Sequence, residues 1–234
     1  MIIGLFNMHL AIVIPVYNEG AVIKKVIDSL PKKIKGVNKI TVLAVNDGST
    51  DNSAEEINKT RAYLINLLVN SGAGSATATG LEGAMQIGAD AAVTFDGDGQ
   101  HSPQDIEKVL RPILNGEADL VVGTRLLNPK GMPWYKKIGN KGLNLITFAL
   151  SGKWTTDSQS GFKAFSKKAL HALRFDAMGY EFCSQIIIEV SRNRLKMKEI
   201  PIKVIYNKYS NKKGQSIFNG INIVVKLIFK KITG

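Results

Sequence analysis

Short apolar runs alternate with segments of helical spacing through the first half of this 234-residue chain. The expected helices are about ten residues long or more, which is enough to cross over a sheet and bring in the next strand parallel to the previous one. The pattern therefore predicts an α/β fold, in which helices cover both faces of a mostly parallel, Rossmann-like sheet. The expected strands are residues 10–16, 40–45, 63–69, 91–95 and 119–123, and the expected helices are residues 19–30, 50–61, 74–88 and 102–115.

The second half of the chain is less regular. The expected elements are a loop over 128–133, a helix over 134–150, a strand near 161–165, a helix within 182–192 and a strand near 199–206. Residues 207–215 are polar and basic, and residues 216–233 have helical spacing, with apolar side chains on one side and asparagines and lysines on another. We therefore expect one main domain over residues 1–206, followed by a basic extension with an amphipathic helix over residues 207–234.

The net charge of +12 is carried by the second half of the chain. Residues 1–123 contain 10 Lys and Arg against 14 Asp and Glu, whereas residues 124–234 contain 21 against 5. Such an excess points to an anionic partner, for which a phosphorylated substrate, a phospholipid surface and nucleic acid are the candidates. The basic segments lack interleaved aromatic residues and any known nucleic-acid-binding module, so we expect no nucleic acid.

Cysteine usage and the two ends of the chain bear on the compartment. The single cysteine, Cys183, excludes an intramolecular disulfide and fits a reducing compartment such as the cytoplasm. Residues 1–7 lack the basic start of a signal peptide and are too few, and Met8 is an alternative start. The tail helix is too interrupted by polar residues to span a bilayer. One expectation is that the tail helix lies on an anionic membrane surface, so that the protein is peripheral at the membrane or contacts a membrane protein. The other expectation is that the tail helix packs onto the domain itself.

An acidic turn, Asp96-Gly97-Asp98-Gly99-Gln100, follows the fourth expected strand. The two glycines let the backbone turn sharply, so that both carboxylates and the Gln100 carbonyl oxygen can converge on one point. Hard oxygen ligands of this kind suit Mg²⁺ or Mn²⁺. Taken alone, the segment also fits a solvated Asp-Gly turn.

Polar residues also follow two other expected strands. Tyr17 and Glu19 come after the first strand, and Asn46 and Asp47 come at the end of the second. The carboxyl ends of parallel strands meet at one edge of a sheet, and ligands bind beyond that edge. The shared location therefore favours a ligand site over a plain turn.

Six motifs carry a resemblance to a known family: residues 14–19, 45–51, 70–76, 96–100, 123–125 and 157–162. In this order and at these distances the chain resembles glycosyltransferase family 2, the inverting enzymes with a GT-A fold. Within that family it is most similar to the dolichyl-phosphate mannose synthase and polyprenyl-phosphate glycosyltransferase branch. The resemblance covers about residues 9–206 and identifies the main domain as the catalytic one.

The resemblance implies a nucleotide-sugar site built from the first half of the chain. Pro15, Tyr17 and Glu19 match the segment that frames the nucleotide base, and Asp47 matches the carboxylate that reads the base or the ribose. Gly74 belongs to a glycine-rich segment that lets a helix start approach the nucleotide phosphates. A plain turn with a helix cap is the simpler interpretation of the segment around Asp47.

The resemblance also implies the reaction centre. Asp96, Asp98 and Gln100 match the metal-binding set of the mannose synthases, with Asp96 also facing the nucleotide sugar, so the expected cofactor is Mg²⁺ or Mn²⁺. Arg125 matches a basic residue that stabilises phosphate charge. Asp157 begins the segment that resembles the acceptor-side loop, for which a turn before a strand is the simpler interpretation.

The mechanism implied is an in-line displacement at the anomeric carbon with inversion. A lipid monophosphate acceptor is already anionic and needs no strong general base, so positioning and charge neutralisation would carry catalysis. A hydroxyl acceptor would need a carboxylate base, for which Asp157 and Glu181 are the candidates. The candidates for holding an acceptor phosphate are Lys137, Lys163, Lys208, Lys212 and Lys213.

Three departures from the family pattern keep alternatives open. The chain has Cys183 and Gln185 where the family often has carboxylates, lacks the branch's Arg and final Lys around Gly214, and has no transmembrane helices after the catalytic domain. The favoured function is transfer of mannose from GDP-mannose to a polyprenyl or dolichyl phosphate. The alternatives are a transferase that uses a UDP-sugar and a sugar hydroxyl or other acceptor, and a degenerate module that binds nucleotide or membrane.

Overall fold

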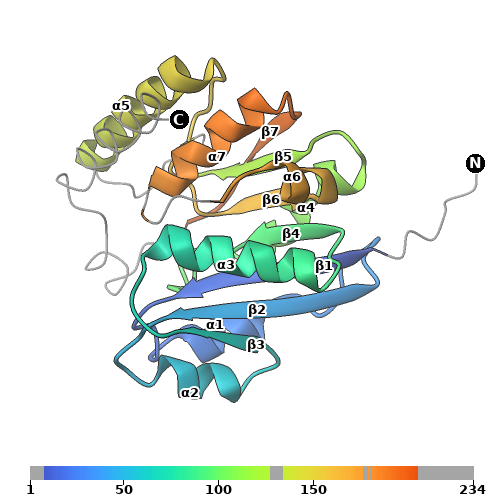
Figure 1. Cartoon of the computed structure of the whole chain (residues 1–234), viewed down its shortest axis with the longest axis vertical. Helices are drawn as coiled ribbons and strands as arrows, with labels where there is room; N and C mark the ends of the chain where they lie inside the picture. Colours follow the sequence, from blue (N-terminus) through green and yellow to red (C-terminus); the bar gives the residue numbers. More distant parts are fainter. Residues whose placement is uncertain (1–7, 127–133, 176–178, 180, 205–234) are drawn as a thin grey trace, which may run out of the picture.

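The computed structural model describes residues 8–126, 134–175, 179 and 181–204. Within them, one seven-stranded sheet runs in the order β3-β2-β1-β4-β6-β5-β7 (Figure 1). Strand β6 is antiparallel to its neighbours β4 and β5, and the other pairs are parallel. The predicted mostly parallel α/β sheet is therefore confirmed. The strands are β1 (His9–Val16), β2 (Lys39–Asp47), β3 (Tyr63–Leu67), β4 (Ala91–Thr94), β5 (Leu120–Thr124), β6 (Lys163–Ser166) and β7 (Met197–Pro201).

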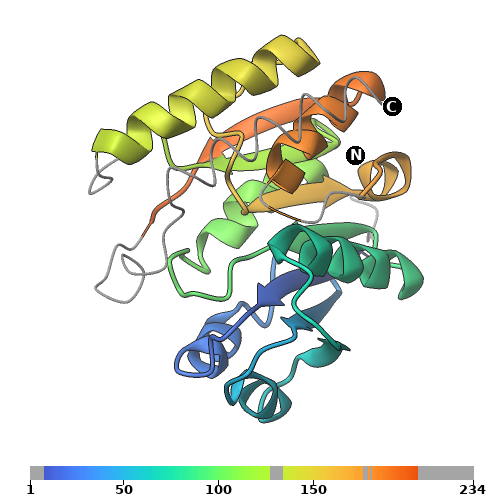
Figure 2. The same cartoon turned by 60° about the vertical axis from the view of Figure 1, so that its left-hand side comes forward.

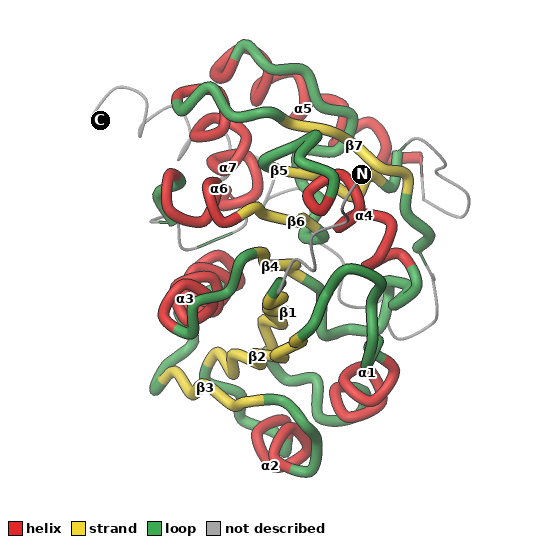
Figure 3. The backbone as a smooth tube through the Cα atoms, turned by 90° about the vertical axis from the view of Figure 1, so that its right-hand side faces the viewer, coloured by secondary structure: helices red, strands yellow, loops and turns green. Residues whose placement is uncertain are grey.

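Helices cover both faces of this sheet because its central strands are apolar on both sides. Successive residues of a strand point to opposite faces, so Ile12 and Ile14 of β1 pack in one core and Ala11 and Val13 in the other. Helices α1, α2 and α4 contribute to the first core, and α3, α6 and α7 to the second (Figure 3). The helices are α1 (Ile23–Ser29), α2 (Ser53–Asn58), α3 (Ala73–Gln86), α4 (Asp105–Leu114), α5 (Trp134–Ser151), α6 (Lys167–Ala172) and α7 (Glu181–Arg192).

Helix α3 lies unusually close to the sheet, as its small residues predict. A Cβ atom added to Gly80 would lie 2.2 Å from Cγ1 of Val13 in β1, closer than any real contact. The buried positions of α3 are otherwise mostly alanines, with Leu81 as the large exception. Small side chains here allow the helix backbone to approach β1 and β2 directly.

Helix α5 lies on the outside of the molecule, beyond α7, against which it packs (Figures 1 and 2). Its buried residues Asn144 and Thr147 face inward, and one of its sides is left exposed. The described helices include none that is long and apolar enough to cross a membrane.

The sequence prediction differs from the structure in a few places. Helix α6 was not predicted, and α1 and α2 are shorter than the helices expected over 19–30 and 50–61. The last strand ends at Pro201 rather than near residue 206, because its partner β5 ends at Thr124, which pairs with Pro201. The loop over 128–133 and the extension over 207–234, including its amphipathic helix, lie outside the described residues, so the domain boundary at 206 stays a prediction.

Candidate active site

The loops that follow β1 and β2 are joined by hydrogen bonds. The amide of Asn18 donates to Ser49 Oγ (3.0 Å), and the amide of Thr50 donates to Asn18 Oδ1 (2.8 Å). The amide of Glu19 donates to Ser53 Oγ (2.8 Å). Asn18 adopts φ 53°, a left-handed conformation that asparagine tolerates better than most residues. These bonds fix the two loops as one rigid edge of the site.

The predicted base-framing residues lie on this edge but differ in exposure. Pro15 is half-buried within β1, beside Val45 of β2. The Tyr17 side chain is 46% exposed, so its ring is open to a ligand. Glu19 is buried, and its carbonyl oxygen accepts the amide of Ile23 at the start of α1. Tyr17 is therefore the member of this group whose side chain is free to stack on a nucleotide base.

Asp47 ends β2 and is buried at 2% exposure. Its Oδ1 accepts the amide of Ser71 (2.8 Å) and its Oδ2 accepts the amide of Gly72 (2.9 Å). The carboxylate thus holds the segment that leads into α3, where Gly74 lies buried in the first turn. Each carboxylate oxygen keeps a second lone pair, so this role does not exclude contact with a nucleotide.

The acidic turn follows β4 and packs beneath the end of β1. A Cβ atom on Gly97 would lie 3.1 Å from the Pro15 carbonyl oxygen, which explains the glycine there. Asp98 Oδ1 accepts the amide of Gln100 (2.9 Å), and Asp98 Oδ2 accepts Gln100 Nε2 (2.5 Å). In this arrangement the Gln100 nitrogen, rather than its carbonyl oxygen, faces Asp98, so Gln100 would have to rotate its amide to become a third oxygen ligand.

The two carboxylates of the turn ionise differently. Burial raises the pKa of Asp98 to about 6, with further contributions from the negative charges of Asp96 and, more weakly, Glu19. Burial also pushes the pKa of Asp96 upward, but the hydrogen bond from His101 and the nearby charges of His101, Arg125 and Lys163 outweigh it and lower that pKa. The site therefore holds Asp96, whose pKa is lowered, beside Asp98, whose pKa is raised by burial and by its like-charged neighbours.

This donor set fits a divalent cation. Asp96 and Asp98 offer hard carboxylate oxygens whose negative charges repel one another. A bound Mg²⁺ or Mn²⁺ would relieve that repulsion. The described residues contain no cluster of three or more His, Cys, Asp and Glu side chains with metal-binding geometry. A cation bound here would have two carboxylates from the described residues, and its remaining coordination positions would be open to other oxygen ligands, as in magnesium sites with substrate phosphates.

Arg125 and Asp157 form a bidentate ion pair at the end of β5. The Arg125 side chain donates from Nε to Asp157 Oδ2 (2.7 Å) and from Nη2 to Asp157 Oδ1 (2.8 Å), and the Arg125 amide also donates to Oδ2 (3.0 Å). Asp157 is fully buried, whereas the Arg125 side chain keeps 23% exposure. Asp157 is therefore placed to orient Arg125, and a role as general base for a hydroxyl acceptor would require breaking this pair.

The loop that starts with Asp157 also touches the acidic turn. A Cβ atom on Gly161 would lie 2.5 Å from Asp96 Oδ1, so only glycine leaves room for that carboxylate. Thr94, the last residue of β4, donates from Oγ1 to the Gly161 carbonyl oxygen (2.6 Å). The acceptor-side loop and the acidic turn are thus one packed unit.

The remaining candidate residues differ in burial, and some of them lie outside the described part of the chain. Lys163 is 2% exposed and donates from Nζ to the carbonyl oxygen of Ser160, so it is not a solvated surface lysine, and its role in holding an acceptor phosphate stays a prediction. Glu181 begins α7, is buried, and accepts the amide of Gly179 (3.1 Å). Lys137 is half-buried on α5. Lys208, Lys212, Lys213 and Gly214 lie outside the described residues.

Sequence reasoning missed His101, which follows the acidic turn directly. Its Nε2 lies 2.8 Å from Asp96 Oδ2, and the residue is only 4% exposed. A lone histidine carries little signal in a single sequence. The sequence feature that pointed to a role for His101 was its position directly after the predicted ligand Gln100.

Comparison with known proteins fits this geometry. A family model described as Glycosyl transferase family 2 matches residues 11–174, which contain the acidic turn, Arg125 and Asp157. The chain belongs to glycosyltransferase family 2. The UDP-N-acetylglucosamine–dolichyl-phosphate N-acetylglucosaminyltransferase of Methanococcus voltae is 42% identical over 94% of this glycosyltransferase and 95% of the relative. The dolichol-phosphate mannosyltransferase of Pyrococcus furiosus is 22% identical over 94% of this chain and 64% of the relative.

Solved structures confirm the GT-A fold of this glycosyltransferase. Glucosyl-3-phosphoglycerate synthase from Mycobacterium tuberculosis, in complex with Mn²⁺, UDP and phosphoglyceric acid, matches with a TM-score of 0.72. The match covers 94% of this chain and 78% of that chain at 19% identity. At that identity the likeness establishes the fold and leaves the substrate open.

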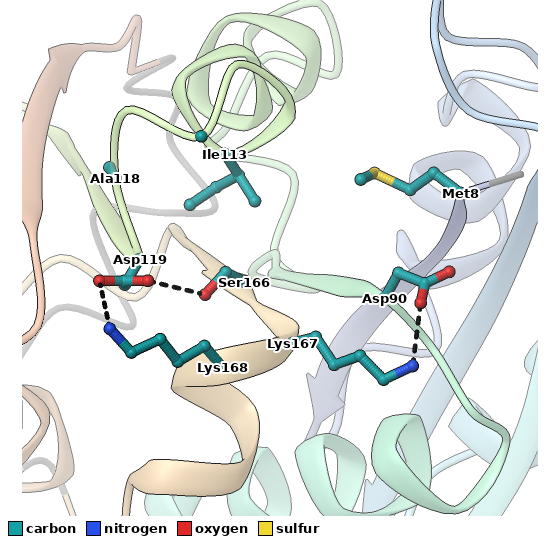
Figure 4. A pocket seen from close by; sticks show the side chains of 9 residues that line it. Met8, Asp90, Ile113, Ala118, Asp119, Ser166, Lys167 and Lys168 are labelled. Carbon is teal, nitrogen blue, oxygen red and sulfur yellow. Dashed lines mark hydrogen bonds and ion pairs between the residues drawn. The ribbon is translucent and has the colours of Figure 1, made fainter. Parts of the chain in front are cut away.

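A pocket of about 420 Å³ lies at the opposite edge of the sheet, where β1, β4 and β5 begin (Figure 4). Its charged side chains are paired: Lys167 with Asp90 (3.1 Å) and Lys168 with Asp119 (3.6 Å). Because each lysine faces a carboxylate, the charged side chains that line the pocket carry no net positive charge to favour a phosphorylated substrate. The acidic turn and Arg125 therefore define the candidate active site of this glycosyltransferase.

Proposed function

We propose that this glycosyltransferase moves a sugar from a nucleoside-diphosphate donor to a polyprenyl phosphate such as dolichyl phosphate. The observation that carries the proposal is the packing of the Asp96–Asp98 turn against the Asp157–Gly161 loop, whose Asp157 holds the Arg125 side chain. One side of this unit is a carboxylate pair suited to a cation, and the other is a guanidinium suited to a phosphate. A donor diphosphate and an anionic acceptor need both groups within one site.

UDP-N-acetylglucosamine is the donor we expect, in place of the GDP-mannose that the branch resemblance favours. The relative with that donor in its name is 42% identical to this chain along nearly its whole length. The relatives named for mannosyl transfer are 22% to 27% identical. A donor preference follows the base and sugar contacts, which diverge faster than the fold.

On the donor side, Tyr17 offers an exposed ring for the base, and the rigid edge made by the β1 and β2 loops orients it. Asp96 and Asp98 would hold Mg²⁺ or Mn²⁺. Bound there, the ion would neutralise the charge that develops on the departing diphosphate. Gln100 would join them by turning its carbonyl oxygen inward.

On the acceptor side, Arg125 would bind the lipid phosphate, and Asp157 fixes the orientation of its guanidinium. A phosphate oxygen forms a bond to the anomeric carbon while the bond from that carbon to the donor's phosphate oxygen breaks. The nucleoside diphosphate leaves with the electron pair, and the anomeric configuration inverts. No proton has to be removed from the nucleophile, which agrees with a site whose buried Asp157 is committed to Arg125.

The test is product formation with defined donors and acceptors. Purified protein with Mn²⁺ or Mg²⁺ is given UDP-N-acetylglucosamine, UDP-glucose or GDP-mannose, together with a short polyprenyl phosphate or the matching polyprenol. We expect a glycosyl-phosphate lipid, detected by mass spectrometry, with UDP-N-acetylglucosamine and the phosphate acceptor. Equal product from the polyprenol would overturn the acceptor assignment, and product from GDP-mannose alone would overturn the donor assignment.

We further propose that the exposed side of α5 docks on an anionic membrane, where such an acceptor resides. The large apolar side chains there are exposed by 62% at Ile138, 61% at Leu145 and 39% at Phe148. Trp154, 59% exposed, packs edge-to-face on Phe148 with ring centroids 5.6 Å apart. Apolar side chains flanked by cations are the pattern of helices that lie in a membrane interface.

Charge favours a lipid surface over a protein partner for this side of α5. Residues 134–156 contain four lysines and no acidic residue. Lys141 is exposed on α5, and Lys137 and Lys153 are half-buried. A segment of this charge complements anionic headgroups. The proposal for α5 adds to the earlier prediction that the tail helix lies on a membrane and does not replace it. The tail helix lies outside the described residues.

Flotation with vesicles tests this surface. The protein is mixed with vesicles of phosphatidylcholine alone or with about 30% phosphatidylglycerol, since each basic residue near an anionic surface contributes about 1 kcal/mol. We expect binding to the anionic vesicles and its loss in Leu145→Asp, while Leu68→Asp, at a 99% exposed position after β3, keeps it. Binding that survives Leu145→Asp would assign membrane contact to another part of the chain. Binding to neither kind of vesicle would leave a protein as the partner of this side of α5.

A further inference from the structure

His101 makes one polar side-chain contact in the described part of the chain. Its Nε2 lies 2.8 Å from Asp96 Oδ2, whereas its Nδ1 is buried without a hydrogen-bond partner there. The residue is 4% exposed, so bulk water does not serve Nδ1 either. The ring therefore directs its hydrogen bonding at Asp96 alone.

Aromatic rings hold the imidazole in place. Phe95 lies 5.9 Å from it between ring centroids, at an interplanar angle of 63°, and Phe162 lies 5.2 Å away at 57°. The two phenylalanines also contact each other at 5.3 Å. The His101 backbone forms an isolated antiparallel bridge with Val204. Ring and backbone are thus both fixed, as a group that orients another must be.

This arrangement is unfavourable as simple core packing. A buried polar atom without a partner costs about 1–3 kcal/mol, and a phenylalanine in the same aromatic surroundings would avoid that cost. Buried unsatisfied groups in folded proteins call for a reason beyond stability. The only reason visible in the described structure is the bond to Asp96.

Asp96 is held from a second direction as well. A Cβ atom added to Gly161 would lie 2.5 Å from Asp96 Oδ1, so the acceptor-side loop closes one side of the carboxylate. His101 fixes the other oxygen. Between them the two residues leave the carboxylate little freedom to rotate.

We infer that His101 is a positioning residue that fixes the Asp96 carboxylate in the orientation required to bind the divalent cation. The inference rests on the proposed metal-dependent transfer. A carboxylate oxygen can only accept a hydrogen bond, so Nε2 of His101 donates to Asp96 Oδ2. Hydrogen-bonded partners of metal ligands typically change metal affinity by about 10- to 100-fold when removed.

The experiment measures Mn²⁺ binding directly, by electron paramagnetic resonance of the free ion, with and without UDP. His101→Phe keeps the shape of the ring and removes the donor. His101→Gln places an amide nitrogen near the position of Nε2, and His101→Asn places one near Nδ1. His9→Phe is the matched control, because His9 is 9% exposed, bonds to Thr41 Oγ1 (2.8 Å) and lies at the opposite edge of the sheet.

We expect His101→Phe and His101→Asn to weaken Mn²⁺ binding by about 10-fold or more, and His101→Gln to recover most of it. His9→Phe should leave Mn²⁺ binding unchanged. Thermal unfolding of each protein checks that it is folded, and if His101→Phe does not fold, the Gln and Asn pair decides. Mn²⁺ binding within about threefold of wild type in both Phe and Asn variants, or equal loss in Gln and Asn, would overturn the inference. If the wild-type protein itself binds no Mn²⁺ with UDP present, the proposed metal-dependent function fails first.

Discussion

Asp98→Asn should make the metal-free protein more stable at alkaline pH while abolishing its response to metal. In the folded protein the pKa of Asp98 is raised from 3.8 to about 6, first by burial and then by the charge of Asp96. The folded state therefore binds the proton more tightly than the unfolded state does. Ionised Asp98 lowers the free energy of unfolding, and this loss grows as pH rises from about 4 and is complete above about 6.

The size of the effect follows from the shift. Each pKa unit corresponds to 1.36 kcal/mol, so a shift of about two units sets an upper bound of about 3 kcal/mol. Asp98 keeps some solvent contact, which screens its charge, and the expected gain at pH 8 is therefore about 1–2 kcal/mol. For a domain of this size that corresponds to an increase in Tm of about 2–8 °C.

The assay is urea or thermal unfolding in EDTA at pH 8 and pH 4. Asn retains an oxygen that accepts the Gln100 amide, so the backbone bond of the turn survives. Asp28→Asn serves as control, because Asp28 is half-exposed and only pairs with Lys24 on the surface of α1. A gain in Asp98→Asn that is as large at pH 4 as at pH 8, or a loss at pH 8, would refute the electrostatic reasoning. Added Mn²⁺ should stabilise the wild type and leave Asp98→Asn unchanged.

Three further predictions concern single residues. Arg125→Lys should lower turnover with a lipid phosphate by about 10²-fold, with little change in UDP affinity measured by calorimetry, because a lysine keeps the charge and loses the bidentate geometry. Gly161→Ala should weaken Mn²⁺ binding by about tenfold, since its Cβ would lie 2.5 Å from Asp96 Oδ1, whereas Gly142→Ala, with no atom within 4 Å, should not. Gly80→Ala should reduce the free energy of unfolding in urea by about 1–3 kcal/mol through overpacking of α3 on β1, and a neutral result would show that the helix can shift outward.

Much of the fold was predictable because its signal is local. The strands of the first half are apolar runs bounded by turn residues and alternate with segments of helical spacing, so their order follows from the sequence. The helix ends were predicted less well, since α1 has seven residues and α2 has six where helices over 19–30 and 50–61 were expected. Helix α6 has six residues and shows no period. The direction of β6 depends on pairing with β4 and β5, which are distant in sequence, and nothing in Lys163–Ser166 itself specifies it.

The candidate site was predictable by residue type and less so by role. The acidic turn is compact in sequence, and its carboxylates do perturb one another. The roles of Asp47 and Asp157 depend on partners 24 to 32 residues away, so the sequence did not show that one carboxylate accepts the amides before α3 and the other accepts Arg125. The burial of Lys163 was not predictable for a related reason, because a lysine in a strand gives no sign of burial in the sequence.

The antiparallel direction of β6 is what assembles the site. Strands β4 and β5 run the same way, and their carboxyl ends carry the acidic turn and Arg125. β6 lies between them and runs the opposite way, so its beginning, with the loop from Asp157 to Gly161, reaches that same edge. A parallel β6 would place this loop at the opposite edge, beside the pocket near Asp90. Arg125 would then lose its partner, and Asp96 would lose the wall that limits its rotation. One reversed strand thus brings the carboxylates proposed to bind the cation and the guanidinium proposed to bind a phosphate into a single packed unit.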